Sequence, residues 1–269
     1  MCSLSKEKSI HVTVDVDSLR SEIRDKSVKV LDIRKEDDYK QGHIPGAINL
    51  PLAGLLADDS PDKVLQYAQS FGIGDETSVV VYDDTFGALA SRVAWTLEYV
   101  GHRDVSLLDV TYSTWKKLGL ETSSDIPSLT KTTHSLKLQP QILATSDYLI
   151  PAKEKGAILV DNRERLNFLE QHIPGAINIP YRMLASGQNI LRPKEDLKRL
   201  FQNRNIGQDS EIITYCGSVG TLSGLGYYAL KSLGMNNAKL YVRSFKEWKS
   251  LDKPIEKQKD ANYWDLSAE

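Results

Sequence analysis

Short apolar runs alternate with longer stretches of mixed polarity along most of this chain. In the first half, runs rich in β-branched residues, typical of buried parallel strands, cover 28–33, 47–50, 78–82 and 105–108. Helix-like stretches such as 61–71 and 88–100 lie between them. The second half repeats the alternation, with strand-like runs at 157–160, 176–179, 211–215 and 239–242. This order predicts an α/β fold with two parallel sheets, each with helices on both faces.

The two halves also repeat one another in sequence. The segment VKVLDIRKEDDYKQGHIPGAINLP (28–51) matches GAILVDNRERLNFLEQHIPGAINIP (156–180), with His43 and His172 separated by 129 residues. Further along, Tyr82 aligns with Tyr215 at a separation of 133 residues. Shared sequence in register with shared pattern indicates a tandem duplication.

The repeats are joined by a segment without periodicity. TSSDIPSLTKTTHSLKLQPQ (122–141) is polar and contains two prolines, as interdomain linkers often do. We therefore predict an N-terminal domain over 1–121, a linker over 122–141 and a C-terminal domain over 142–269. The tail is expected to pack back on the protein through Tyr263 and Trp264.

Composition narrows the class of protein. Hydrophobic residues make up 41% of the chain, charged residues 26%, and the formal net charge is −2, so nothing favours a nucleic-acid or membrane partner. No apolar run approaches the ~18 residues of a membrane span. Cys2 and Cys216 are the only cysteines, which disfavours a structural disulfide or a zinc site and suits a cytoplasmic protein.

Cys216 stands at the junction of a predicted strand and a predicted helix, in EIITYCGSVGTLSGLG. The first N–H groups of a helix lack intrahelical partners and carry partial positive charge, so they would stabilise a thiolate. Gly217 and Gly220 allow the backbone to turn its N–H groups inward around an anion, and Ser218 and Thr221 add hydroxyl donors. The plain alternative is that Cys216 is a small buried apolar residue.

The duplication favours the functional interpretation. Asp83 and Cys216 occupy equivalent positions after a predicted strand, where ligands bind in open parallel sheets. Asp83 is followed by DTFGALAS, an acidic and bulkier turn that we expect to cradle an anion poorly. We therefore expect the second domain to hold the nucleophile and the first to be noncatalytic.

Two α/β repeats, each with an Asp-x-Arg strand end and a HIPGAIN segment, resemble the tandem-domain rhodaneses, the thiosulfate and 3-mercaptopyruvate sulfurtransferases. The resemblance covers nearly the whole chain. It implies that Cys216 is the catalytic nucleophile and carries a persulfide, passed from a small-molecule donor to cyanide or a thiol without a cofactor or metal. It also implies that the persulfide is cradled by the substrate-binding loop residues Gly217, Ser218, Val219, Gly220 and Thr221.

The loop sequence bears on the donor. CGSVGT is closer to the CGSGVT of mercaptopyruvate enzymes than to the basic CRKGVT of thiosulfate enzymes, although the stretch NLPLAGLLADDSPDK lacks the histidine that the former carry. By the same resemblance, Arg163 would bind the substrate carboxylate. Position 167, where a second arginine is usual, is Asn167, and Arg165 is the nearby substitute. Arg92 is a weaker candidate for the cleft.

Several alternatives remain open. Asp32–Arg34 and Asp161–Arg163 occur in both repeats, so a structural ion pair is at least as good an interpretation of Arg163. The repeated histidines and tryptophans, His43, His172, Trp115 and Trp248, are expected to be structural. A cysteine phosphatase would need an arginine at position 222, which is Leu222. A noncatalytic module that relays sulfur from a protein persulfide is the other rival.

Overall fold

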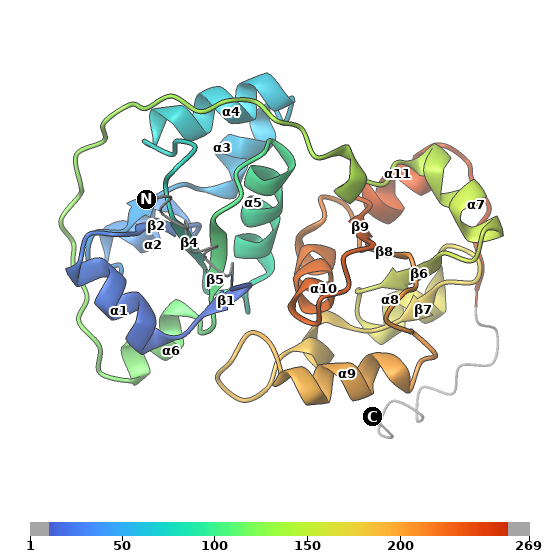
Figure 1. Cartoon of the computed structure of the whole chain (residues 1–269). Coiled ribbons are helices and arrows are strands. Elements are labelled where there is room, and N and C mark those ends of the chain that lie inside the picture. The colour runs from blue at the N-terminus through green and yellow to red at the C-terminus, as the bar shows by residue number, and fades with distance from the viewer. Residues whose placement is uncertain (1–10, 258–269) are drawn as a thin grey trace, which may run out of the picture.

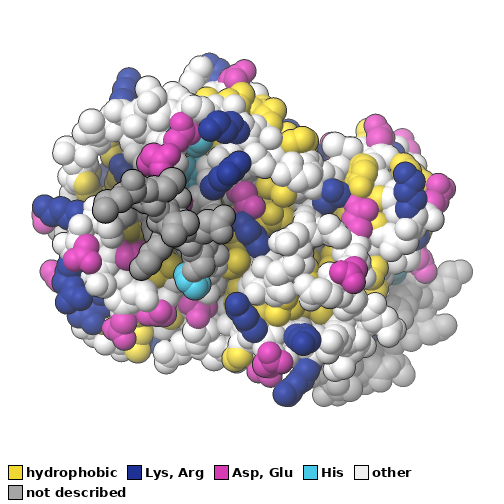
Figure 2. All heavy atoms as spheres, in the orientation of Figure 1, with side chains coloured by type: hydrophobic (Ala, Val, Ile, Leu, Met, Phe, Trp, Pro, Cys, Tyr) yellow, Lys and Arg dark blue, Asp and Glu magenta, His cyan; other side chains and the backbone are white. Residues whose placement is uncertain are grey.

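The computed structural model describes residues 11–257, which form two α/β units packed side by side (Figure 1). The expected packing of Tyr263 and Trp264 lies outside the described residues. Figure 2 shows acidic and basic side chains interspersed over the visible face, in keeping with the small net charge. No helix within the described part of the chain is long and apolar enough to cross a membrane.

The first unit is a five-stranded parallel sheet in the order β1-β5-β4-β2-β3. Its strands are β1 (Thr13–Val14), β2 (Lys29–Asp32), β3 (Ile48–Asn49), β4 (Val79–Tyr82) and β5 (Val105–Leu108). Its helices are α1 (Val16–Arg24), α2 (Glu36–Lys40), α3 (Leu52–Ala57), α4 (Pro61–Ser70), α5 (Ala88–Tyr99) and α6 (Tyr112–Lys117). Every residue of β4 and β5 is buried, which explains their continuous apolar sequences.

The second unit repeats this arrangement with a four-stranded parallel sheet in the order β7-β6-β8-β9. Its strands are β6 (Ile158–Asp161), β7 (Ile177–Asn178), β8 (Ile212–Tyr215) and β9 (Ala238–Leu240). Its helices are α7 (Ser146–Glu154), α8 (Arg165–Glu170), α9 (Lys194–Gln202), α10 (Thr221–Ser232) and α11 (Ser244–Ser250), with short 3₁₀ helices η1 (Pro140–Ile142) and η2 (Tyr181–Leu184). The predicted parallel α/β architecture is confirmed in both units.

Helices α5 and α10 pack against each other and join the units (Figure 1). The Ser91 hydroxyl donates to the Thr221 carbonyl at 3.3 Å, and a Cβ built on Gly224 would lie 2.9 Å from Ser91 Oγ. Only glycine therefore permits this approach. One apolar cluster runs from the first sheet through both helices into the second sheet, so the two units share a core.

The segment predicted as a linker contains no helix or strand over 122–139 but is bound closely to the first unit. Ser123 and His43 exchange backbone hydrogen bonds of 2.8 Å, and the Ser135 N–H donates to Asp75 at 3.0 Å. Lys137 continues the contact by donating to the Val100 carbonyl. The segment is thus a strap along the first unit, and the domain limits at 121 and 142 stay a prediction.

The duplicated histidines and tryptophans are structural, as predicted. His43 Nδ1 and His172 Nδ1 lie 2.9 and 2.7 Å from the backbone carbonyl oxygens of Tyr39 and Phe168, one helical turn earlier. Trp115 and Trp248 are each 2% exposed in the cores of their units. Neither pair contributes to the site described below.

Candidate active site

Cys216 follows β8 directly, at the carboxyl end of the second sheet, and is 2% exposed. Its backbone N–H donates to Ser244 Oγ at 3.1 Å, and the same hydroxyl lies 3.7 Å from Cys216 Sγ. Ser244 has a φ of 56°, an unusual backbone conformation for a residue other than glycine, and in it the side chain contacts Cys216. The Ser244 hydroxyl also lies 2.9 Å from the Tyr241 carbonyl, so its single proton can serve either acceptor.

The loop after Cys216 is held by hydrogen bonds from the segment that follows β9, while several of its own N–H groups have no acceptor among the described residues. The Phe245 and Lys246 N–H groups donate to the carbonyls of Cys216 and Gly217 at 3.1 and 2.9 Å. Gly220 caps α10 with a φ of 75°, which turns the backbone toward the cysteine. Within the described part of the chain, no acceptor pairs with the backbone N–H groups of two loop residues and two residues in the first turn of α10: Ser218, Gly220, Leu222 and Ser223.

The equivalent loop of the first unit shows what such donors can bind. Asp83 Oδ1 accepts from the N–H groups of Thr85 and Gly87 at 2.9 and 2.8 Å, and Oδ2 accepts from Leu89 and Ala90 at 2.8 and 2.9 Å. The expectation that this loop cradles a bound anion poorly stays a prediction, and the structure gives another reason for it: the Asp83 carboxylate already occupies the N–H groups. These four residues lie 133 positions before Ser218, Gly220, Leu222 and Ser223.

Arg163 lies beside the loop but is bonded to protein groups. Its Nε and Nη2 donate to both carboxylate oxygens of Asp161 at 2.6–3.0 Å, and Nη2 also donates to the Gln171 carbonyl. Burial alone would lower the pKa of Arg163, but the hydrogen bonds and charge of Asp161 raise it. Arg34 makes the same pair with Asp32 in the first unit, which has no cysteine at the position of Cys216, so this geometry favours a structural role. A substrate contact for Arg163 stays a prediction.

Arg92 reaches the loop from the other unit. It is 2% exposed on α5, and its Nε donates to the Val219 carbonyl at 2.8 Å. Burial lowers the pKa of Arg92 to about 10, while the charges of Asp59 and Cys216 act in the opposite direction. The sequence analysis ranked Arg92 below Arg163, whereas the structure places its guanidinium directly on the loop. Arg165, the other candidate, begins α8.

Sequence reasoning missed three residues around the loop. Ser244 lies beneath Cys216, while Asp59 forms ion pairs with Arg243 at 3.0 Å and with Arg92 at 3.8 Å. Ser244 and Arg243 follow β9, and Asp59 belongs to the other unit, so no short motif links them to the cysteine. Among residues 11–257, no group of three or more His, Cys, Asp or Glu side chains could hold a metal ion.

Comparison with known proteins identifies the family and the fold. The family model "Rhodanese-like domain" matches residues 15–118 and 145–251. The chain is 26% identical to the sulfur carrier protein TtuD of Thermus thermophilus, over 89% of this chain and 94% of that protein. It is 29% identical to a putative thiosulfate sulfurtransferase of Haloferax volcanii, over 81% and 85% of the two chains. The crystal structure of SseA from Escherichia coli, described as a 3-mercaptopyruvate sulfotransferase, superimposes with a TM-score of 0.77 at 26% identity, covering 87% and 99% of the two chains.

Proposed function

The chain belongs to the rhodanese-like domain family and is a sulfurtransferase, and we propose that it transfers a sulfane sulfur through a persulfide on Cys216. The observation that carries the mechanism is the Asp83 carboxylate in the first loop. A loop of the same backbone pattern, with a cysteine in place of the aspartate, offers its four N–H groups to a larger anion. The terminal sulfur of a persulfide extends one atom beyond Sγ and is such an anion.

In the first half-reaction, the Cys216 thiolate attacks the transferable sulfur of the donor and forms an S–S bond. The donor's S–S or C–S bond breaks, and its electron pair leaves with sulfite or with the enolate of pyruvate, which takes up a proton. In the second half-reaction, the acceptor attacks the outer sulfur and Cys216 leaves as the thiolate. No oxidant or reductant is needed, because each step forms one bond to the transferred sulfur and breaks another, and the electron pair of the broken bond stays with the leaving group.

The loop composition favours 3-mercaptopyruvate as donor. Gly217 and Ser218 follow the cysteine, and no lysine or arginine lies between Cys216 and Thr221 to bind the second charge of thiosulfate. A monocarboxylate donor has less charge to neutralise. The residues Gly217, Ser218, Val219, Gly220 and Thr221 form the proposed substrate-binding loop, which supplies the Ser218 and Gly220 N–H groups of the cradle, and Arg163 is the proposed contact for the donor carboxylate.

A second candidate function is a sulfur relay that accepts sulfur only from another protein's persulfide. The similarity to the sulfur carrier protein TtuD favours this candidate, and it uses the same cysteine. The two functions differ in the donor that loads Cys216. A small donor that loads the isolated protein supports the enzyme, whereas loading only by a protein persulfide supports the relay.

The test is the intact mass of the purified protein after incubation with thiosulfate and, separately, with 3-mercaptopyruvate. We expect a reducible gain of one sulfur, ~32 Da, faster with 3-mercaptopyruvate and absent from Cys216→Ser. A gain that persists in Cys216→Ser would overturn the assignment of the nucleophile. Faster loading by thiosulfate would overturn the assignment of 3-mercaptopyruvate as the preferred donor. Loading by neither molecule would favour the sulfur relay.

A further inference from the structure

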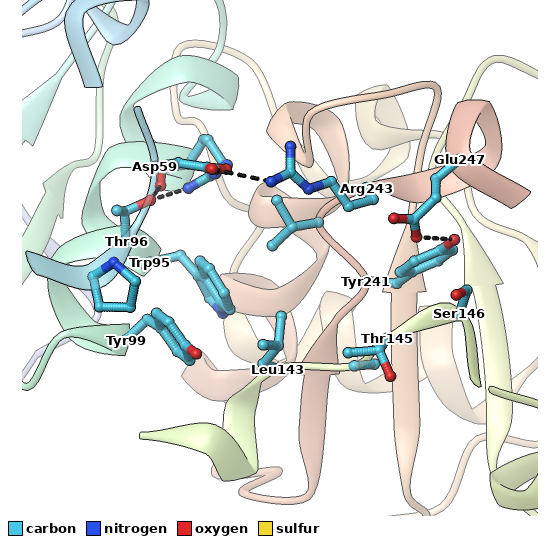
Figure 3. Close-up of a pocket in the computed structure, with 14 residues that line it drawn as sticks. Asp59, Trp95, Thr96, Tyr99, Leu143, Thr145, Ser146, Tyr241, Arg243 and Glu247 are labelled. Atoms are coloured by element: carbon cyan, nitrogen blue, oxygen red, sulfur yellow. Dashed lines mark hydrogen bonds and ion pairs between the residues drawn. The ribbon is translucent and has the colours of Figure 1, made fainter. Parts of the chain in front are cut away.

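A cavity of about 300 Å³ lies between the two units, next to the candidate active site, with which it shares Arg92, Asp59 and Arg243 (Figure 3). The first unit contributes Asp59 and the α5 residues Arg92, Trp95 and Tyr99, and the second contributes Arg243 and residues near it. Cys216 is not among the lining residues. The volume is at the lower end of the range for small-molecule sites, roughly 300–1,000 Å³.

One wall of this cavity is apolar and carries an unused hydrogen-bond donor. Trp95 and Tyr99 stack with ring centres 5.3 Å apart, and Figure 3 shows them on the side facing Leu143. Trp95 is 3% exposed, and its Nε1 has no partner among the described residues. A buried N–H group without an acceptor is costly, and a ligand oxygen would satisfy it.

The other end of the cavity carries two arginines that share one carboxylate. Arg243 Nη2 lies 3.0 Å from Asp59 Oδ1, whereas Arg92 Nη2 lies 3.8 Å from Asp59 Oδ2, beyond hydrogen-bonding distance. Glu247, the other lining carboxylate, accepts a hydrogen bond from the Tyr241 hydroxyl. Among the described residues, Arg92 Nη2 and Arg243 Nη1 are therefore left without a hydrogen-bond acceptor.

From these features we propose that the interdomain cavity binds a small organic carboxylate, with its apolar part against Trp95 and Tyr99 and its oxygens on Trp95 Nε1, Arg92 and Arg243. The apolar wall selects an organic anion over an inorganic one. The carboxylate competes with Asp59, which already occupies part of the arginine pair. Cys216 does not line the cavity, so we place this carboxylate beside the site of sulfur transfer and do not identify it with the sulfur donor.

The proposal is tested by calorimetric titration of the full chain with sodium benzoate, and with benzamide as the uncharged analogue of the same shape. We expect saturable binding of benzoate, and weaker or no binding of benzamide or sulfate. Arg243→Gln and Trp95→Phe should each weaken benzoate binding about fivefold or more, while Asp59→Asn, which removes the internal competitor, should strengthen it about as much.

Two controls separate this site from surface charge and from the catalytic loop. Arg182→Gln removes an arginine of similar exposure, 66% against 62%, that is likewise paired with a carboxylate, and it should leave binding unchanged. Cys216→Ser should also leave binding unchanged, whether or not the persulfide mechanism holds. Absence of saturable benzoate binding, equal binding of benzamide or sulfate, or equal loss in Arg182→Gln and Arg243→Gln would overturn the proposal.

Discussion

The Asp83 and Cys216 loops have nearly the same backbone but opposite occupancy. Gly87 and Gly220 cap the following helices with φ values of 81° and 75°, and both helices begin at equivalent residues. In the first loop the carboxylate of Asp83 fills the ring of N–H donors, whereas in the second the corresponding donors have no partner within the described chain. The same fold thus forms a closed structural turn in one unit and leaves the equivalent N–H donors open in the other, where we propose an anion site.

The helices between the loops are also equivalent in place and different in chemistry. Arg92 of α5 bonds the Val219 carbonyl in the second loop, and its counterpart 133 residues later is Leu225 of α10. Leu225 approaches the first loop at Gly87, where a built Cβ would lie 3.4 Å from Leu225 Cδ1. Each unit therefore supplies a side chain to the other's loop, but only the cysteine loop receives a charged one.

The largest expected effect comes from giving the second loop the first loop's residue. Cys216→Asp should lower sulfur transfer at least about a thousandfold, because no nucleophile remains. The new carboxylate should also occupy the open N–H groups and raise the melting temperature. Donor turnover and thermal unfolding measure the two effects, and Cys216→Ser is the control that loses activity without the gain in stability. A lower melting temperature in Cys216→Asp than in Cys216→Ser would contradict the shared geometry.

The same truncation at the two equivalent positions should have unequal costs. Asp83→Ala leaves buried N–H groups unpaired and should lower the free energy of unfolding by about 3 kcal/mol, whereas Cys216→Ala should lower it by less than about 1 kcal/mol. Urea unfolding followed by circular dichroism measures both. Asp84→Ala is a control for charge, because Asp84 lies in the same loop and, among residues 11–257, accepts hydrogen bonds only from Ser113 in an exposed contact. Equal losses at Asp83 and Cys216 would show that the cradle contributes no stability.

A smaller effect is expected when Arg92 of α5 is replaced by leucine, the residue at the equivalent position of α10. Arg92→Leu removes the hydrogen bond to Val219 and the positive charge near Cys216, and should lower kcat/KM about 10- to 100-fold through misplacement of the loop. Steady-state kinetics measures this, with the fall expected mainly in kcat. Leu225→Met is the matched control on α10 and should leave transfer unchanged. If Arg92→Leu and Leu225→Met behave alike, the guanidinium does not position the loop.

These contrasts show which parts of the molecule the sequence can predict. Strands such as β5 were predicted correctly because every residue in them is buried, so the apolar run coincides with the strand. Strand β1 was missed because two residues, Thr13 and Val14, form no recognisable run. Cys216 and its loop were predicted from contiguous residues, and their roles await the experiments above.

The remaining site residues depend on tertiary contacts that no local pattern records. Ser244, which follows β9, accepts a hydrogen bond from the Cys216 N–H at the end of β8. Asp59 of the first unit accepts one from Arg243 of the second. The role of Asp83 was missed for a related reason: in the sequence an aspartate is a bulky charge, and only the folded loop shows that its carboxylate accepts the loop's own N–H groups. Residue pairings of this kind can be identified only in the folded structure.

The smallest expected effect concerns a buried histidine that only the first unit has. His102 is 1% exposed, and its counterpart 133 residues later is Met235, which is 3% exposed. Burial, and then the neighbouring His134, lower the pKa of His102 from 6.5. The unfolded chain therefore binds a proton below pH 6.5 that the folded chain resists, so stability falls as pH falls through this range. Between pH 7.5 and 5.5 this histidine should cost up to about 1 kcal/mol. His102→Met should reduce that pH dependence in thermal unfolding, and an unchanged slope would show that other groups cause it.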